Sequence, residues 1–476
     1  MEKVDKKDYL ILLLTAIGIM LICTKSSPFY PYNDWGDANI YFTMGKGILQ
    51  GQIPYRDLYD HKGPLIYIAY SLAALISKKN FLGVWFLEIA AAYFFLLYSY
   101  KILRLFCDEK VIVMMPVYAA VVYAADHMRH GGSAEELCLP LLSYGLYILL
   151  EYLLNGKKFK SKELLMLGIT SGCVLWTKYT MLGFYVGWIV IPAIMMLTKK
   201  QYKEFAKTLG YIAAGVMIIT FPIILYFGLQ SALDDLFKVY FYNNIFLYTG
   251  EKVSFGRLLL RTFWNILYVV KNNFVTFGMI IIGNLYLLLT KKAEVYFSIL
   301  LEFLGLVLLV LTAETIHGYY SMCFSVFCVF GFAFLWQILE RIECKIAVSF
   351  AVMFLFAYFT GYNKESLFGR KELLPQYQFA EIMNMSDDPT LLNYGFLDGG
   401  FYTVAGIVPT NKYFFEANIN LPEMKESQQE IIANGQVEYV VTFDEQYQWT
   451  NYEKIASADY QMEGNKITYY LYKLIN

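Results

Sequence analysis

Ionisable side chains that could do chemistry gather in a few short polar stretches of an otherwise apolar chain. The first reads GDANIYFTMGKGILQGQIPYRDLYDHKGPLIY (36–67) and contains Asp37, Arg56, Asp57, His61 and Lys62. A carboxylate such as Asp37 could act as a general base or orient a substrate, or it could simply be an acid favoured by a helix N-terminus. Arginine, histidine and lysine so close together suit a phosphate group, which takes several hydrogen-bond donors at once. A solvated loop would explain the same charges.

The second stretch, DHMRHGGSAEELCLP (126–140), places Glu135 and Glu136 at the start of an apolar segment. The helix dipole accounts for one acid there. Two acids that lead into a membrane span are costly, and such acids usually have a function. A carboxylate at this place could bind an amine, sugar hydroxyls or a metal ion.

Two further stretches carry Lys178, in WTKYT, and the pair His317 and Tyr319, in ETIHGYY. Lys178 interrupts an apolar run from 164 to 198 that is too long for one span, so we predict a turn beside it. The lysine either extends its amine out of the lipid or binds a lipid phosphate. The histidines have no zinc-ligand spacing, so we predict no metal site and no cofactor. Asp34 is an alternative to Asp37 as the first acid.

The composition is that of a polytopic membrane protein. Of 476 residues, 58% are hydrophobic and 17% charged, whereas soluble domains have about a quarter charged residues. The net charge of −1 gives no indication of a nucleic-acid partner. The seven cysteines lie in or beside apolar segments, so we interpret them as core residues without disulfides.

Apolar segments long enough, or nearly so, to cross about 30 Å of hydrocarbon number eleven. With the N-terminus in the cytoplasm, every basic connector between them faces the cytoplasm, in agreement with the positive-inside rule. This topology places the polar loops 25–80, 126–136 and 229–271 outside the cell membrane. The segments are 9–24, 81–103, 111–125, 137–154, 163–177, 180–198, 208–228, 272–290, 295–312, 319–338 and 345–361.

Two regions do not read as spans. Residues 64–77 are too short to cross and end in two lysines, which favours a helix at the outer membrane surface. The chain from 362 to 476 is less hydrophobic, and we predict a small extracytoplasmic α/β domain after a transmembrane domain at 1–361. Its predicted strands are TLLNYG, KYFF and EYVVTF, followed by a hairpin with Gly464 in its turn, and PEMKESQQEIIANG reads as a helix.

The order of GDANIYF, PYRDLYDHKGPLIY, SAEELCLP, GITSGCVLWTKYT and HGYY over residues 9–361 resembles the GT-C-fold glycosyltransferases. These enzymes use polyprenyl-phosphate sugars, and they include protein O-mannosyltransferases and aminoarabinose transferases of the family 39 type. The resemblance implies a GT-C-like membrane domain of about eleven helices. It also implies transfer of a sugar, a hexose in many members, from a polyprenyl-phosphate donor to a cell-envelope glycan, lipid or protein at the outer face.

The resemblance also implies roles for individual residues. Asp37 would be the catalytic base, and Glu135, or Glu136, would be the acid of the second outer loop. Lys178, with His61 and Lys62, would hold the lipid phosphate. Many members have Asp-Glu at the first site, where this chain has Asp37-Ala38.

Three other functions fit parts of the sequence. A polysaccharide polymerase or ligase would take a lipid-pyrophosphate donor and would favour an arginine-rich outer loop, but residues 229–262 contain only Arg257 and Arg261. A transporter for lipid-linked sugars would show repeat symmetry and acids or broken helices at mid-membrane, and we take only Glu88 within a span as pointing that way. A receptor or anchor would work through its tail and would not depend on Asp37 or Lys178.

Overall fold

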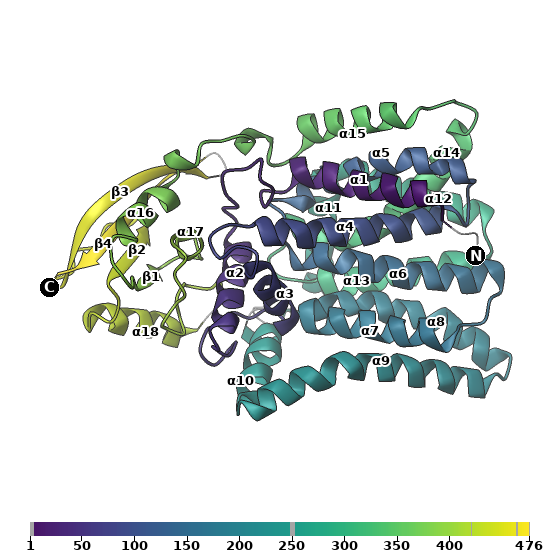
Figure 1. The fold of residues 1–476 in the computed structure, drawn as a ribbon. Coiled ribbons are helices and arrows are strands. Elements are labelled where there is room, and N and C mark those ends of the chain that lie inside the picture. Colours follow the sequence, from purple (N-terminus) through teal and green to yellow (C-terminus); the bar gives the residue numbers. More distant parts are fainter. Residues whose placement is uncertain (1–3, 248–252, 420, 463–464, 476) are drawn as a thin grey trace. The chain divides into compact units, whose positions relative to one another are not determined.

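The computed structural model describes residues 4–247, 253–419, 421–462 and 465–475, which form two compact units. The first, which we call the helical unit, comprises Met1–Thr24, Leu87–Ile224 and Glu251–Glu365. The second, which we call the sheet unit, comprises Lys25–Phe86, Leu225–Gly250 and Ser366–Asn476. Figure 1 shows the elements of both.

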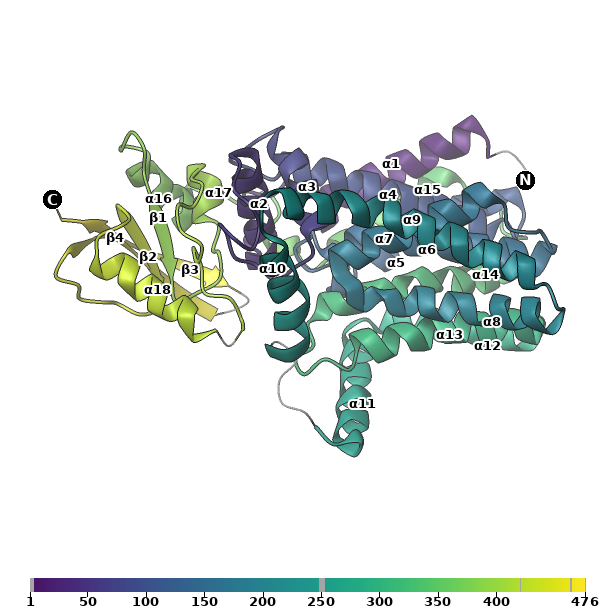
Figure 2. The same cartoon turned by 90° about the horizontal axis from the view of Figure 1, so that it is seen from below.

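Long apolar helices dominate the helical unit. Among the described residues, six helices are long and apolar enough to cross a membrane. A seventh span results if α11 and α12, which meet at an angle of 108° (Figure 2), count as one. The chain is therefore a multi-pass membrane protein, while the number of eleven spans stays a prediction. The α-helices that lie wholly or mostly in the helical unit are α1 (Lys6–Cys23), α4 (Leu82–Leu103), α5 (Met115–Tyr123), α6 (Ala134–Asn155), α7 (Ser161–Lys178), α8 (Gly183–Thr198), α9 (Tyr202–Leu229), α11 (Phe255–Asn272), α12 (Phe274–Thr290), α13 (Ala293–Val310), α14 (Cys328–Leu339) and α15 (Ile346–Thr360).

Glycines let these helices pack backbone to backbone. A Cβ added at Gly183 of α8 would lie 2.0 Å from the carbonyl oxygen of Gly305 in α13. One turn further along α8, a Cβ at Gly187 would lie 2.4 Å from the carbonyl oxygen of Leu301. Membrane helices use such small-residue contacts because lipid supplies no hydrophobic drive for helix association. The predicted turn at Lys178 is present, because α7 ends there and the short 3-10 helix Tyr179–Leu182 leads into α8.

The sheet unit combines helices of the chain's first third with the C-terminal domain. The early helices are α2 (Gly36–Leu49) and α3 (Pro64–Ala74), and α10 (Leu233–Leu236) leads into the π-helix Phe237–Leu247. The C-terminal part contains α16 (Pro375–Met383), β1 (Leu391–Tyr394), α17 (Phe401–Ala405), α18 (Pro422–Ala433), β2 (Tyr439–Phe443), β3 (Tyr452–Met462) and β4 (Asn465–Leu474).

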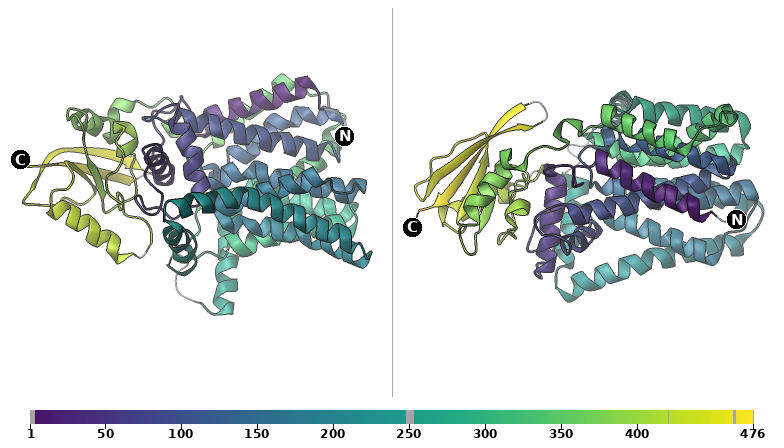
Figure 3. Two further views of the ribbon diagram at one scale, coloured as in Figure 1. Left: turned by 60° about the horizontal axis from the view of Figure 1, so that its bottom comes forward. Right: turned by 45° about the horizontal axis from the view of Figure 1, so that its top comes forward.

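The four strands form one sheet in the order β1-β2-β4-β3, parallel between β1 and β2 and antiparallel elsewhere. Side chains alternate across it, so Val440 packs with Ile431 of α18 on one face. On the other face, Tyr469 contacts Phe401 of α17, and Phe401 stacks on Phe379 of α16. Helices therefore cover both faces, as Figures 1 and 3 show.

The predicted fold class, a polytopic helical membrane protein with a small α/β domain, is confirmed. The helix at 64–77 is present as Pro64–Ala74, with proline in its first turn. Two predicted strands are β1 and β2, and the hairpin is β3–β4, but its predicted turn at Gly464 lies outside the described residues.

The predicted strand KYFF (412–415) is wrong. These residues have no regular structure, although Asn393 N donates to Phe414 O at 3.2 Å beside β1. Phe414 and Phe415 are fully buried. Their aromatic side chains therefore pack in the core although the backbone does not pair as a strand.

Candidate active site

Asp37 lies in the first turn of α2, where the helix dipole favours an acid. Tyr41, one turn later, donates its hydroxyl to Asp37 Oδ2 at 3.2 Å, and Lys62 Nζ lies 3.7 Å from the same oxygen. The Asp37 and Lys62 side chains are 17% and 14% exposed. The structure therefore brings together two predicted site residues, an acid and a base, in a partly buried ion pair.

The loop before α3 holds Lys62 through a buried acid that we did not assign to the site from the sequence. Asp60 is 3% exposed and accepts a hydrogen bond from the Tyr67 hydroxyl at 2.7 Å. Burial raises the pKa of Asp60, and the charge of Lys62 opposes that rise. His61 Nδ1 lies 3.9 Å from Asp60, and Tyr55 donates to the Lys62 carbonyl at 2.6 Å. The loop conformation thus depends on buried tyrosines that no motif singles out.

The π-helix Phe237–Leu247 supports the same loop from a distant part of the sequence. Asn244 Nδ2 donates to the His61 carbonyl at 2.6 Å, and Asn243 Nδ2 donates to the Tyr59 hydroxyl at 3.3 Å. Both asparagines are buried. π-Helical geometry is rare and frequently occurs at functional sites.

The other predicted residues of this loop lie in a separate, more exposed pair. Arg56 Nε contacts Asp57 at 2.9 Å, with exposed fractions of 42% and 32%. This hydrogen bond lowers the pKa of Asp57. Arg56 also donates to the Gln230 carbonyl at 2.8 Å. Within the described residues neither side chain has an ion pair or hydrogen bond with Asp37 or Lys62.

Asp34, the alternative first acid, has partners of its own. Lys25 Nζ lies 2.7 Å from Asp34 Oδ1, and the Tyr460 hydroxyl of β3 donates to Oδ2. Lys25 is buried, which makes this a structural ion pair. Asp37 therefore remains the better candidate for chemistry.

In the helical unit, Lys178 forms an ion pair with Glu135. Its amine also lies over the ring of Tyr320, 3.9 Å from the centroid, and 5.4 Å from that of Tyr319. His317 stacks on Tyr319 with ring centroids 5.6 Å apart. Four predicted residues (Lys178, Glu135, His317 and Tyr319) thus form one cluster.

Glu136 belongs to a different buried cluster, so the two adjacent glutamates have separate environments. Glu136 Oε2 accepts the Gly132 amide at 2.9 Å, and the Glu136 amide donates to the helix-capping Ser133 at 3.0 Å. Glu88, a buried acid of α4, accepts the Thr24 hydroxyl at 2.7 Å. Glu136 is thus fixed by backbone groups at the start of α6, whereas Glu135 is fixed by Lys178.

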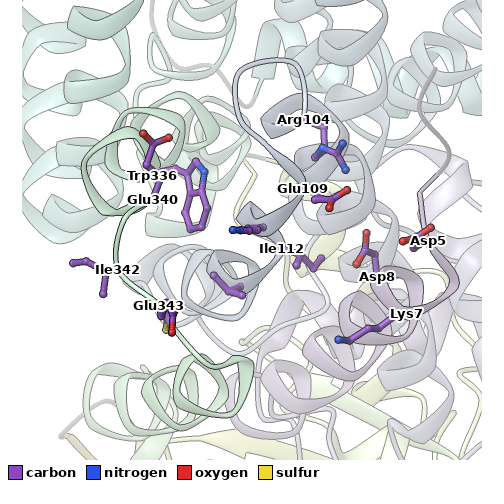
Figure 4. Close-up of a pocket in the computed structure, with 13 residues that line it drawn as sticks. Asp5, Lys7, Asp8, Arg104, Glu109, Ile112, Trp336, Glu340, Ile342 and Glu343 are labelled. Atoms are coloured by element: carbon purple, nitrogen blue, oxygen red, sulfur yellow. The ribbon is translucent and has the colours of Figure 1, made fainter.

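A large cavity in the helical unit lies away from both clusters. Its volume is about 620 Å³, and Figure 4 shows residues at the start of α1, at 104–113 and at 336–344 around it. Its lining includes five acids and three bases: Asp5, Asp8, Glu109, Glu340 and Glu343, with Lys7, Arg104 and Lys110. None of the predicted site residues lines this cavity. In the described part of the chain, no group of three or more His, Cys, Asp or Glu side chains could hold a metal ion.

The fold defines a class of proteins: multi-pass helical membrane proteins with a small α/β domain. Within this class, the chain is similar to ArnT from Cupriavidus metallidurans. Crystal structures of ArnT bound to undecaprenyl phosphate and in the apo state each match with a TM-score of 0.61 and 10% identity, over 97% of both chains. This likeness establishes the shared fold. No family model matches the sequence, and no curated protein matches it.

Proposed function

We propose that this protein is an integral-membrane glycosyltransferase that moves a sugar from a polyprenyl-phosphate-linked donor to a cell-envelope acceptor. The observation that carries the proposal is the Asp37–Lys62 pair, an acid and a base 3.7 Å apart, beside the buried Asp60. The fold of ArnT, which binds undecaprenyl phosphate, supports a lipid-phosphate donor. The positive-inside pattern of the sequence supports a reaction at the outer face of the membrane.

Asp37 takes the role of general base in this proposal. The acceptor hydroxyl oxygen attacks the anomeric carbon of the sugar, and its proton passes to Asp37. The bond from that carbon to the phosphate oxygen breaks, and the electron pair stays on the departing polyprenyl phosphate. Lys62 and the hydroxyl of Tyr41 orient the Asp37 carboxylate in this proposal.

Lys62 is the proposed ligand of the donor phosphate in the sheet unit, and Lys178 is the candidate phosphate ligand of the helical unit. A phosphate that gains charge as it leaves is stabilised by a fixed cation. Lys62 is held by its buried loop, and Lys178 is held by Glu135 and two tyrosine rings. Glu135 orients Lys178 in this proposal, and Tyr319 and His317 form an aromatic surface for the sugar.

The test uses the purified protein in lipid nanodiscs. Polyprenyl-phosphate hexoses are added one at a time, with native membrane extract as the acceptor source, and the release of polyprenyl phosphate is measured. We expect release with one donor, loss of release in Asp37→Asn, and normal release in the control Asp459→Asn, whose exposed carboxylate pairs with Lys466. Absence of release with every donor from a folded protein would contradict the proposal.

A further inference from the structure

Helix α2 has a second polar face that does not bear Asp37. Asn39, Thr43 and Lys46 follow one another at spacings of four and three residues, so they lie on one side of the helix. Their exposed fractions are 0%, 0% and 1%. A lysine and two polar side chains buried to this degree need partners, because unpaired polar groups are costly in a protein interior.

The C-terminal domain supplies partners to this face. Lys46 Nζ donates to the carbonyl oxygens of Tyr402 and Ile407, both at 2.8 Å. Thr43 Oγ1 donates to Asp398 Oδ2 at 2.9 Å. These bonds join residues more than 350 positions apart in the sequence and end on one segment, 398–407, which we call the docking loop.

Asn39 makes the third connection. Its Oδ1 accepts the hydroxyl of Thr403 at 3.0 Å and also that of Tyr32. Next to it, Gly400 has φ of +91°, and a Cβ there would lie only 1.7 Å from the Tyr32 hydroxyl oxygen. Glycine is therefore required at this position of the docking loop.

Asp398 is itself fixed within the docking loop. It is fully buried, and besides Thr43 it accepts the side-chain amide of Asn393 at 3.1 Å and the backbone amide of Gly400 at 2.9 Å. Three donors hold the carboxylate in one orientation. The acceptor that Thr43 meets therefore has little freedom to move.

A third side of α2 packs tightly against α3. A Cβ at Gly45 would lie 2.7 Å from the backbone nitrogen of Ser71, so no larger residue fits. Helix α2 is thus held between α3 and the docking loop. Buried hydrogen bonds add little net stability compared with apolar packing, but their directionality fixes how a helix is rotated and how far it slides.

We propose that the docking loop of the C-terminal domain positions α2, and with it Asp37, against Lys62, so that Lys46, Thr43 and Asp398 are positioning residues for sugar transfer. This inference rests on the proposed function. The C-terminal domain is then a working part of the transferase.

The test compares Thr43→Val, which removes one hydroxyl donor at nearly constant shape, with Thr43→Ser, which keeps it. Asp459→Asn is the control on the surface of the same domain. Hydrogen–deuterium exchange over 36–49 reports on the helix, and kcat and the donor KM report on transfer. Because a hydrogen bond to a charged group is lost, we expect about 10-fold faster exchange in α2 and about 10-fold lower kcat in Thr43→Val, with an unchanged KM. Thr43→Ser should behave as wild type.

The two readouts separate the two proposals. Exchange in α2 that is the same in Thr43→Val and Asp459→Asn would overturn the positioning role, whatever the activity. Faster exchange with unchanged kcat would overturn it as well, since the helix would then move without consequence for transfer. A wild-type protein that transfers no sugar would refute the proposed function. Faster exchange of α2 in Thr43→Val than in that wild-type protein would still support the docking of α2.

Discussion

Replacement of Asp37 by asparagine tests the proposed chemistry with little disturbance of the structure. Asparagine keeps the shape and can still accept the Tyr41 hydroxyl, which lies 3.2 Å away. It loses the ability to take a proton, and general-base catalysis contributes about 10² to 10⁴-fold. The lost ion pair with Lys62 is partly exposed and 3.7 Å long, so its loss costs at most about 1 kcal/mol of stability.

We therefore expect kcat to fall by about 10² to 10⁴-fold in Asp37→Asn, with a small change in melting temperature. The assay is the initial rate of polyprenyl-phosphate release at saturating donor, and donor binding is measured separately by titration. Asp57→Asn is an informative comparison, because it removes an acid of the same outer stretch that pairs with Arg56. A kcat within twofold of wild type in Asp37→Asn would refute the role of Asp37. An equal loss in both variants would point to a general effect of charge.

Three further predictions concern other buried charges. Lys178→Ala alone would leave Glu135 buried without its cation, so the double variant Lys178→Ala/Glu135→Gln is the better test. We expect the donor KM of the double variant to rise about 10-fold and that of the control Lys160→Ala, which removes an exposed lysine, to stay unchanged. Burial lowers the pKa of Lys46 to about 7; the charge of Asp398 opposes this shift, and the charges of Lys78 and Lys79 add to it. The unfolded chain therefore binds more protons than the folded chain between pH 7 and about 10. The unfolding free energy of wild type relative to Lys46→Met should therefore increase across that range in denaturant titrations, and a decrease would show that the lysine stays charged. Glu136→Gln keeps an oxygen that can accept the Gly132 amide and should melt within a few degrees of wild type, whereas Glu136→Leu leaves that buried amide without its acceptor and should melt clearly lower; equal melting of the two would argue against a structural role of this hydrogen bond.

Apolar periodicity predicted the parts of the fold that are set locally. The helix predicted at 64–77, which the structure shows as Pro64–Ala74, follows from a short apolar run that ends in two lysines, and the turn at Lys178 follows from a lysine inside a run too long for one span. The failure at KYFF (412–415) has the opposite origin. Aromatic residues favour strands only where a neighbouring strand can form backbone hydrogen bonds with them along its length. Here the aromatic side chains pack into the core without such pairing.

The candidate site could be predicted as a set of residues but not as a set of contacts. Adjacent glutamates at 135 and 136 look equivalent in the sequence, yet helix geometry turns them about 100° apart, so that one contacts Lys178 and the other contacts the Gly132 amide. The contact between Thr43 and Asp398 spans 355 positions and has no local signal. A lysine within the apolar helix 36–49 was the available hint, because a buried lysine needs a distant acceptor.

Asp37 and Asp398, the two aspartates in contact with α2, have environments that suit different roles: a proton acceptor and a structural hydrogen-bond acceptor. Asp398 is fully buried and accepts three hydrogen bonds between 2.9 and 3.1 Å, so protonation of this group would disrupt the docking loop. Asp37 is partly exposed, and its contacts with Tyr41 and Lys62 are longer, at 3.2 and 3.7 Å. A general base must take and return a proton without loss of structure. Of the two, Asp37 fits the proposed role of general base better, and in our proposal the hydrogen bonds of Asp398 on the other side of the helix hold Asp37 in place.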